Sequence, residues 1–214
     1  MASLKYLRLK YANKRQNELN NKDFTIISNN CWGGMIYESY NLEKQSPTVG
    51  LFFMAKDYID FISNLRENLD SEISFINPKD SKYYNELKGN KKFGTYPIGK
   101  IGDIEIMFLH YKSQKEAYEK WTRRKKRVNF EKLIIKFNDQ NGCTQNDIDR
   151  FMNLEYKNKL FFTTKKWKNI NKKYTIKVFQ LFNKKYINSS MEPFGKRITN
   201  YINQIDEKWR KGEL

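Results

Sequence analysis

Three residues with the side chains needed for nucleophilic catalysis stand where apolar runs of the sequence end. Cys31 follows the run FTIIS, His110 ends the run IEIMFLH, and Asp139 follows the run LIIKFN. A thiol acts as a nucleophile when an imidazole takes its proton and a carboxylate orients that imidazole. Because sites in open α/β sheets lie at the carboxyl ends of strands, the sequence predicts a catalytic triad. The same residues also fit structural roles, as a small buried hydrophobe, a hydrogen-bonding strand end and a turn former.

The residues that follow Cys31 favour a site at this position. Gly33 and Gly34 permit a tight turn into a helix. The amino terminus of that helix would lower the pKa of the thiol, and its backbone N–H groups would stabilise an oxyanion. Trp121 fits either a stacking platform or a helix-packing anchor. The residues that we assign to substrate or phosphate binding are Asn29, Asn30, Trp32, Gly33, Gly34, Ser46, Thr48, Tyr111, Trp121, Arg123, Arg124 and Arg127.

The chain is strongly basic, which indicates an anionic partner. Its 214 residues include 41 Lys and Arg against 24 Asp and Glu, a formal net charge of +17. Residues 112–127 hold eight basic and two acidic residues, and such a run attracts phosphate groups. The abundance of Lys and Asn offers the alternative that much of this charge is solvated surface. Because the spacing matches no DNA-reading or RNA-binding motif, we expect no specific nucleic-acid partner.

Short apolar runs alternate with amphipathic stretches, which is typical of an α/β protein. Strands are predicted at 24–28, 73–76, 96–101, 104–109, 133–137, 160–163 and 174–179. Helices are predicted at 4–20, 31–40, 55–69, 113–127, from 144 onward, and at 194–211. The two strands that flank Gly102 and Asp103 form a predicted hairpin, so we expect a layered α/β/α domain with a central mixed sheet. The expected divisions are a basic N-terminal helix at 1–22, an α/β core at 23–182 and a C-terminal helix at 183–214 packed on the core.

Metal and cofactor chemistry receive little support from the sequence. With one histidine and two separated cysteines, Cys31 and Cys143, we expect no metal site and no permanently bound cofactor. Asp147 and Asp149 have the form of the metal-binding acid pair of many sugar-nucleotide transferases. In a helix, however, two residues at this spacing point in different directions, which favours a solvated face.

Several of these segments together resemble a known bacterial family. They are ISNNCWGG, SPTVGLF, YPIGKIGDIEIMFLHY, EKWTRRKKRVN, NDQNGCT and NKLFFT. Their order resembles the family of domain of unknown function 1919, over roughly residues 20–180. The resemblance implies a layered α/β fold and a role in exopolysaccharide or capsule biosynthesis, because members often carry that label. It supplies no catalytic residues to transfer to this chain.

These observations predict a transferase of surface-polysaccharide biosynthesis that uses a phosphate-bearing donor. In acyl transfer from acyl-CoA, Cys31 would attack the acyl group with His110 as base. In glycosyl transfer from a sugar nucleotide, His110 or Asp139 would act as base on the acceptor hydroxyl. The acceptor would be a glycan or a lipid-linked glycan. The alternative is a non-catalytic basic adaptor that recruits glycan-assembly enzymes to the inner face of the membrane.

The expected location is the cytoplasm, with peripheral contact to an anionic membrane. No window approaches the length of apolar sequence that a membrane-spanning helix requires, and the first 20 residues lack the apolar core of a secretory signal. The basic C-terminal helix could lie on a membrane surface, although docking on its own domain explains the same pattern better.

Overall fold

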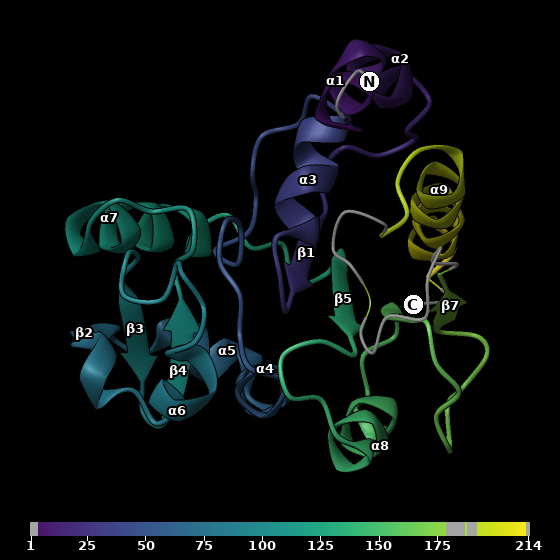
Figure 1. The fold of residues 1–214 in the computed structure, drawn as a ribbon. Coiled ribbons are helices and arrows are strands. Elements are labelled where there is room, and N and C mark those ends of the chain that lie inside the picture. The colour runs from purple at the N-terminus through teal and green to yellow at the C-terminus, as the bar shows by residue number, and fades with distance from the viewer. Residues whose placement is uncertain (1–3, 179–186, 188–191, 213–214) are drawn as a thin grey trace.

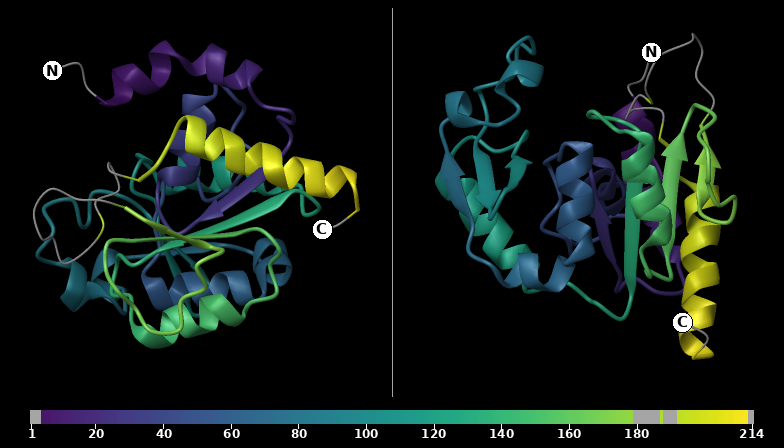
Figure 2. Two further views of the ribbon diagram at one scale, coloured as in Figure 1. Left: turned by 90° about the vertical axis from the view of Figure 1, so that its right-hand side faces the viewer. Right: turned by 90° about the horizontal axis from the view of Figure 1, so that it is seen from below.

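The computed structural model describes residues 4–178, 187 and 192–212, and Figures 1 and 2 show its fold. The strands in this part of the chain are β1 (Thr25–Ser28), β2 (Ser74–Ile76), β3 (Ile98–Ile101), β4 (Ile104–Met107), β5 (Leu133–Asn138), β6 (Lys159–Thr163) and β7 (Thr175–Lys177). The α-helices are α1 (Leu4–Lys10), α2 (Ala12–Asn17), α3 (Trp32–Ser39), α4 (Ala55–Ser63), α5 (Leu65–Asp70), α6 (Tyr84–Leu87), α7 (Gln114–Lys125), α8 (Gln145–Asn153) and α9 (Lys196–Arg210), and a 3-10 turn spans Pro78–Asp80.

A parallel sheet of order β1-β5-β6-β7 forms the centre of the molecule. Neighbouring residues of β5 serve opposite faces, because side chains alternate along a strand. Ile134 packs with α3 and α9 in one core cluster, and Ile135 packs with α4 and α8 in the other. Figure 2 shows helices on both sides of this sheet. The predicted α/β architecture is therefore confirmed.

The predicted hairpin belongs to a second sheet. β2, β3 and β4 form an antiparallel sheet of three strands, with the turn at Gly102, whose φ is +53°. This sheet shares a core with α4 and α7, and Trp121 of α7 lies against the rings of Phe61 and Phe108. Parallel and antiparallel strands thus occupy two sheets rather than one mixed sheet.

Some predicted helices are interrupted. The segment expected as one helix at 55–69 divides at Asn64, which ends α4 and begins α5 with φ −129° and ψ 49°. The basic segment expected at 4–20 divides at Tyr11 and ends at Asn17. At the other end of the chain, α9 buries Ile198, Ile202 and Ile205 against the parallel sheet. Among the helices that the structure describes, none has both the length and the apolar character needed to cross a membrane.

Two glycines allow α3 to lie close to β1 and to the segment beside it. A Cβ atom at Gly33 would be 3.1 Å from Oγ of Ser28, and one at Gly34 would be 2.9 Å from Cγ1 of Val49. Real Cβ atoms seldom approach other atoms so closely. The two glycines therefore set the position of Cys31 and Trp32, which begin this helix.

Candidate functional site

A group of buried polar side chains lies where β1 and β5 end. Lys136, on β5, extends its ammonium group toward Glu192 and toward the amide oxygens of Asn29 and Asn30. Its Nζ is 2.8 Å from Oδ1 of Asn30, and it forms an ion pair with Oε1 of Glu192. We call this group the strand-end cluster. Its members are Asn29, Asn30, Lys136, Asn138, Gln140 and Glu192.

Hydrogen bonds connect every member of the strand-end cluster. Glu192 accepts from Nδ2 of Asn138 at 2.7 Å and from Nδ2 of Asn30 at 3.0 Å. Asn138 also donates to Oε1 of Gln140 at 3.0 Å, and Asn29 donates to Oδ1 of Asn138 at 2.8 Å. Burial lowers the pKa of the Lys136 ammonium, and the carboxylate of Glu192 opposes this shift. The cluster thus holds a desolvated cation among amide groups that fix its geometry.

Asp139 is the first residue after β5, and its side chain turns to the other neighbouring strand, β6. Its Oδ2 accepts from Oγ1 of Thr163 at 2.5 Å and from Nε1 of Trp167 at 3.1 Å. Its Oδ1 is buried and finds no hydrogen-bond partner within the described part of the chain. A buried carboxylate oxygen without a donor is uncommon in folded proteins and calls for an explanation. The structure therefore pairs Asp139 with Thr163 and Trp167 instead of with His110.

Cys31 stands at the N-cap of α3, as the sequence predicts, but its thiol is not activated there. Its Sγ contacts the carbonyl oxygen of Leu51 at 3.7 Å. Burial raises the pKa of Cys31 to about 11, and the negative charge of Glu192 adds to this effect. The expected gain from the helix terminus is therefore smaller than the cost of desolvating a thiolate.

His110 and Cys31 contact neighbouring backbone carbonyls, those of Gly50 and Leu51. The backbone N–H of His110 donates to the carbonyl of Gly50 at 3.0 Å, next to the Leu51 carbonyl that Cys31 contacts. The charges of Glu38 and Lys92 act on both His110 and Cys31. Burial and the ammonium of Lys92 lower the pKa of His110. Within the described residues, no hydrogen bond joins this imidazole to Cys31 or to Asp139, so the structure does not assemble the three as a hydrogen-bonded triad.

Alkylation of Cys31 should be slow at neutral pH. A pKa of about 11 makes its thiolate fraction near neutral pH lower than that of an ordinary thiol by about two orders of magnitude. We expect Cys31 to react with iodoacetamide about 100-fold slower than a peptide thiol, measured by intact mass between pH 7 and 9. Burial also raises the pKa of Cys143, so this second thiol serves as the internal control. A reaction midpoint below that of a peptide thiol, abolished by His110→Ala, would contradict the structure and restore the thiolate mechanism.

Ser46, Thr48 and Trp32 use their polar atoms within the fold. The hydroxyl groups of Ser46 and Thr48 lie 3.0 Å apart, and Thr48 accepts from the backbone N–H of Ser28 at 3.1 Å. They thereby fasten a loop along the edge of β1. Trp32 donates from Nε1 to the carbonyl of Pro193 at 2.9 Å, next to Glu192, which secures that residue over the strand-end cluster.

In the segment 111–127, which contains the basic helix α7, most of the predicted site residues have partners within the fold. Arg124 is buried and donates to the hydroxyl of Tyr111 at 2.7 Å, while that hydroxyl donates to the carbonyl of Val49 at 2.5 Å. Arg127 forms an ion pair with Glu43 at 2.7 Å, and Trp121 is 1% exposed. Arg123 points to solvent. The helix therefore joins two parts of the core and does not present all its cations to one phosphate.

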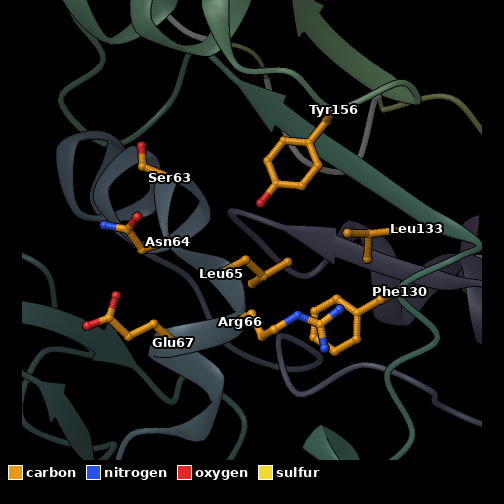
Figure 3. Close-up of a pocket in the computed structure, with 8 residues that line it drawn as sticks. All are labelled: Ser63, Asn64, Leu65, Arg66, Glu67, Phe130, Leu133 and Tyr156. Atoms are coloured by element: carbon orange, nitrogen blue, oxygen red, sulfur yellow. The ribbon is translucent and has the colours of Figure 1, made fainter.

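The cavity shown in Figure 3 lies at the end of the parallel sheet that is opposite to the strand-end cluster. It has a volume of about 390 Å³ and is lined by Ser63, Asn64, Leu65, Arg66, Glu67, Phe130, Leu133 and Tyr156. Leu133 is the first residue of β5, so this cavity lies at the amino end of that strand. The guanidinium of Arg66 lies 3.9 Å from the centre of the Phe130 ring. The described residues contain no group of three or more His, Cys, Asp or Glu side chains that could hold a metal ion.

Six members of the site escaped the sequence analysis: Lys136, Asn138, Gln140, Glu192, Thr163 and Trp167. A signal was present for Lys136, because a lysine inside the apolar run LIIKF must find partners when the strand is buried on both faces. Glu192 carries no comparable signal, since its neighbours in the sequence follow no motif. Its role depends on a tertiary contact with β5.

The fold and the strand-end cluster define an α/β protein in which buried polar side chains lie at the carboxyl ends of two parallel strands. The chain belongs to the family described as a domain of unknown function (DUF1919), whose sequence profile matches residues 2–209. The chain is also 34% identical over 165 residues to an uncharacterized protein of Haemophilus influenzae, a match that covers 77% of this chain and 73% of that protein. The predicted family membership is thereby confirmed.

Proposed function

We propose that this protein transfers a glycosyl group from a phosphate-bearing donor to a hydroxyl group during assembly of a bacterial surface polysaccharide. The observation that carries the chemistry is the buried carboxylate of Asp139, whose Oδ1 has no partner among the described residues. An acceptor hydroxyl that donates to Oδ1 would complete its hydrogen bonding. The pathway is inferred from the sequence resemblance to exopolysaccharide biosynthesis proteins.

In the proposed step Asp139 acts as general base. The acceptor oxygen forms a bond to the anomeric carbon of the donor, the bond from that carbon to the phosphate oxygen breaks, and the proton passes to Oδ1. The nucleoside phosphate leaves with the bonding electrons. Asp139 is fully buried, so neighbouring side chains must move before the hydroxyl reaches it. The strand-end cluster, with its cation and amide groups, adjoins this carboxylate at the end of β5 and supplies polar contacts for the donor.

Acyl transfer through Cys31 receives less support. The raised pKa of Cys31 leaves little thiolate, and a thiolate is the species that attacks an acyl group. We further propose that the acceptor is lipid-linked and that the protein works in peripheral contact with an anionic membrane, because a net charge of +17 favours such a surface.

Replacing Asp139 with Asn tests the glycosyl-transfer proposal. The amide keeps an oxygen to accept from Thr163 and Trp167 but cannot take a proton. With UDP-, GDP-, CMP- and dTDP-linked sugars and a polyprenyl-phosphate-linked acceptor, we expect release of the nucleotide by the wild type and a loss of about 10²–10⁴-fold in kcat for Asp139→Asn.

Two matched variants interpret the result. Asp103→Asn removes the same charge at a fully exposed position and should leave turnover unchanged. Cys31→Ser removes the thiol and therefore tests the alternative of acyl transfer. Turnover of acetyl-CoA that Cys31→Ser abolishes would overturn glycosyl transfer in favour of acyl transfer. Absence of turnover with every donor would favour the adaptor role.

A further inference from the structure

An exposed surface on α1 and α2 combines apolar and basic side chains. Tyr6, Leu9 and Tyr11 are 53%, 49% and 47% exposed, and they are three of the five large hydrophobic residues that the described part of the chain exposes. They fall within six consecutive positions. We call this region the α1–α2 surface, and its members are Lys5, Tyr6, Leu9, Lys10, Tyr11 and Lys14.

The charge of this segment has one sign. Residues 4–17 contain five basic and no acidic residues. Two of the five face the protein, since Arg8 contacts Sδ of Met35 at 3.1 Å and Arg15 donates to the carbonyl of Ser39 at 2.8 Å. Lys5, Lys10 and Lys14 are exposed and form no ion pair with any acid that the structure describes. The arginines thus anchor the helices on α3, while the lysines remain available outside.

Apolar and basic side chains lie next to one another on the outward side of this surface. With 3.6 residues per turn, Leu9 and Tyr6 lie between Lys5 and Lys10 around α1, and Arg8 lies outside this arc. The ammonium of Lys10 is 5.9 Å from the ring centre of Tyr6 and 5.4 Å from that of Tyr11. Figures 1 and 2 show α1 and α2 beyond α3, on the side of that helix away from the sheet. No other described element therefore covers this side.

We propose that the α1–α2 surface docks this protein on an anionic lipid bilayer. The inference rests on the peripheral membrane contact proposed above and names the surface that makes it. Tyr6 and Tyr11 have an apolar ring and a polar hydroxyl, as suits the depth of the headgroups, and Leu9 enters the boundary of the acyl chains. Lys5, Lys10 and Lys14 contact lipid phosphates.

The composition of the surface favours a bilayer over a nucleic acid. An exposed leucine between two tyrosines gains nothing from a phosphate backbone, whereas it removes apolar area from water at a lipid interface. The C-terminal helix is not an equivalent surface. Its isoleucines Ile198, Ile202 and Ile205 are buried on the sheet, so α9 has no comparable apolar face to present.

Vesicle co-flotation of the full chain tests the proposal with two charge-matched double variants. Tyr6→Ser with Lys10→Glu alters the α1–α2 surface. Tyr118→Ser with Lys115→Glu makes the same changes on α7, where Tyr118 is 45% exposed. Vesicles consist of phosphatidylcholine with or without phosphatidylglycerol. We expect the first variant to reduce partitioning onto phosphatidylglycerol vesicles by about tenfold or more, and the second to reduce it by less than about threefold.

Leu9→Ser distinguishes insertion of an apolar side chain into the bilayer from attraction by charge, because it leaves every charge in place. A loss of about threefold or more with this variant supports docking. An equal loss in the α1 and α7 double variants would overturn the proposal, since net charge alone would then explain binding. Failure of the wild type to bind phosphatidylglycerol vesicles would overturn both the surface and the peripheral contact. Glycosyl transfer to a water-soluble acceptor, measured on the same variants, should be unchanged and reports on the chemistry separately.

Discussion

Lys136→Met is expected to lower the free energy of unfolding by about 3–5 kcal/mol. Lys136 and Glu192 are both fully desolvated at their charged ends, and removing the lysine leaves the Glu192 carboxylate buried without a cation. The amide oxygens of Asn29 and Asn30 also lose a donor. Urea unfolding followed by circular dichroism measures the loss, and Lys177→Met on the exposed end of β7 is the control, with an expected change below about 0.5 kcal/mol.

The double variant Lys136→Met/Glu192→Leu should recover part of that loss. Burial lowers the pKa of Lys136 in spite of its partner, which means that the attraction of Glu192 does not offset the desolvation of the ammonium. The loss in the single variant therefore arises chiefly from the orphaned carboxylate, and removing both charges should restore about half of it. If the double variant were no more stable than the single one, Glu192 would not be the partner of Lys136.

Lys136 also gives the stability a dependence on pH. Its pKa lies below the ordinary value of 10.5 in the folded protein, so between those two pKa values the unfolded chain binds more protons. Stability therefore rises with pH across this window. Lys136→Met lacks this contribution, so the difference in unfolding free energy between wild type and variant should increase toward pH 10.5. Tyrosine titration is shared by the two proteins and cancels in the difference.

The strands of the parallel sheet could be predicted from the sequence, whereas the break in the helix expected at 55–69 could not. An unbroken apolar run such as LIIKF predicts a strand buried on both faces, and β5 extends only one residue beyond the predicted end, to Asn138. No comparable pattern in the sequence marks the break at Asn64. The apolar side chains of 55–69 keep a helical spacing through it, because α5 continues to bury Leu65 and Leu69 in the same core as α4.

The candidate site was predicted by position but not by pairing. Cys31, His110 and Asp139 follow or end apolar runs, and strand ends do collect polar side chains here. Pairing depends on which strands are neighbours. Because β5 lies between β1 and β6, Asp139 can turn to Thr163 while Lys136 and Asn138 turn to Asn29 and Asn30. His110 follows β4 of the other sheet, which the sequence placed in the same sheet. That difference removes the carboxylate from the expected triad.

Asp57→Ala is expected to cost about 3–5 kcal/mol of unfolding free energy. Asp57 lies in the first turn of α4 with no exposed surface, and three donors depend on it. Its Oδ1 accepts from Nζ of Lys82 and from the hydroxyl of Tyr83, each at 2.7 Å. Its Oδ2 accepts from the backbone N–H of Glu105 at 2.7 Å. Alanine would remove the acceptor of the Tyr83 hydroxyl and of the Glu105 N–H, and the buried carboxylate of Glu105 would remain. Of its acceptors among the described residues, Lys82 would keep only the carbonyl of Asp103.

The carboxylate of Asp57 joins α4 to β4. Its loss should therefore destabilise the antiparallel sheet before the parallel sheet. α4 packs on the parallel sheet, whereas Glu105 belongs to β4 of the antiparallel sheet. In Asp57→Ala, we expect faster amide hydrogen exchange in β3 and β4 than in β5 and β6, because exchange reports local opening. Asp60→Ala is the matched control on the same helix. Its carboxylate pairs with Lys56 and Arg150 but is 28% exposed, so its loss should cost about 1 kcal/mol or less. Equal losses from the two variants would show that burial of Asp57 does not determine its contribution.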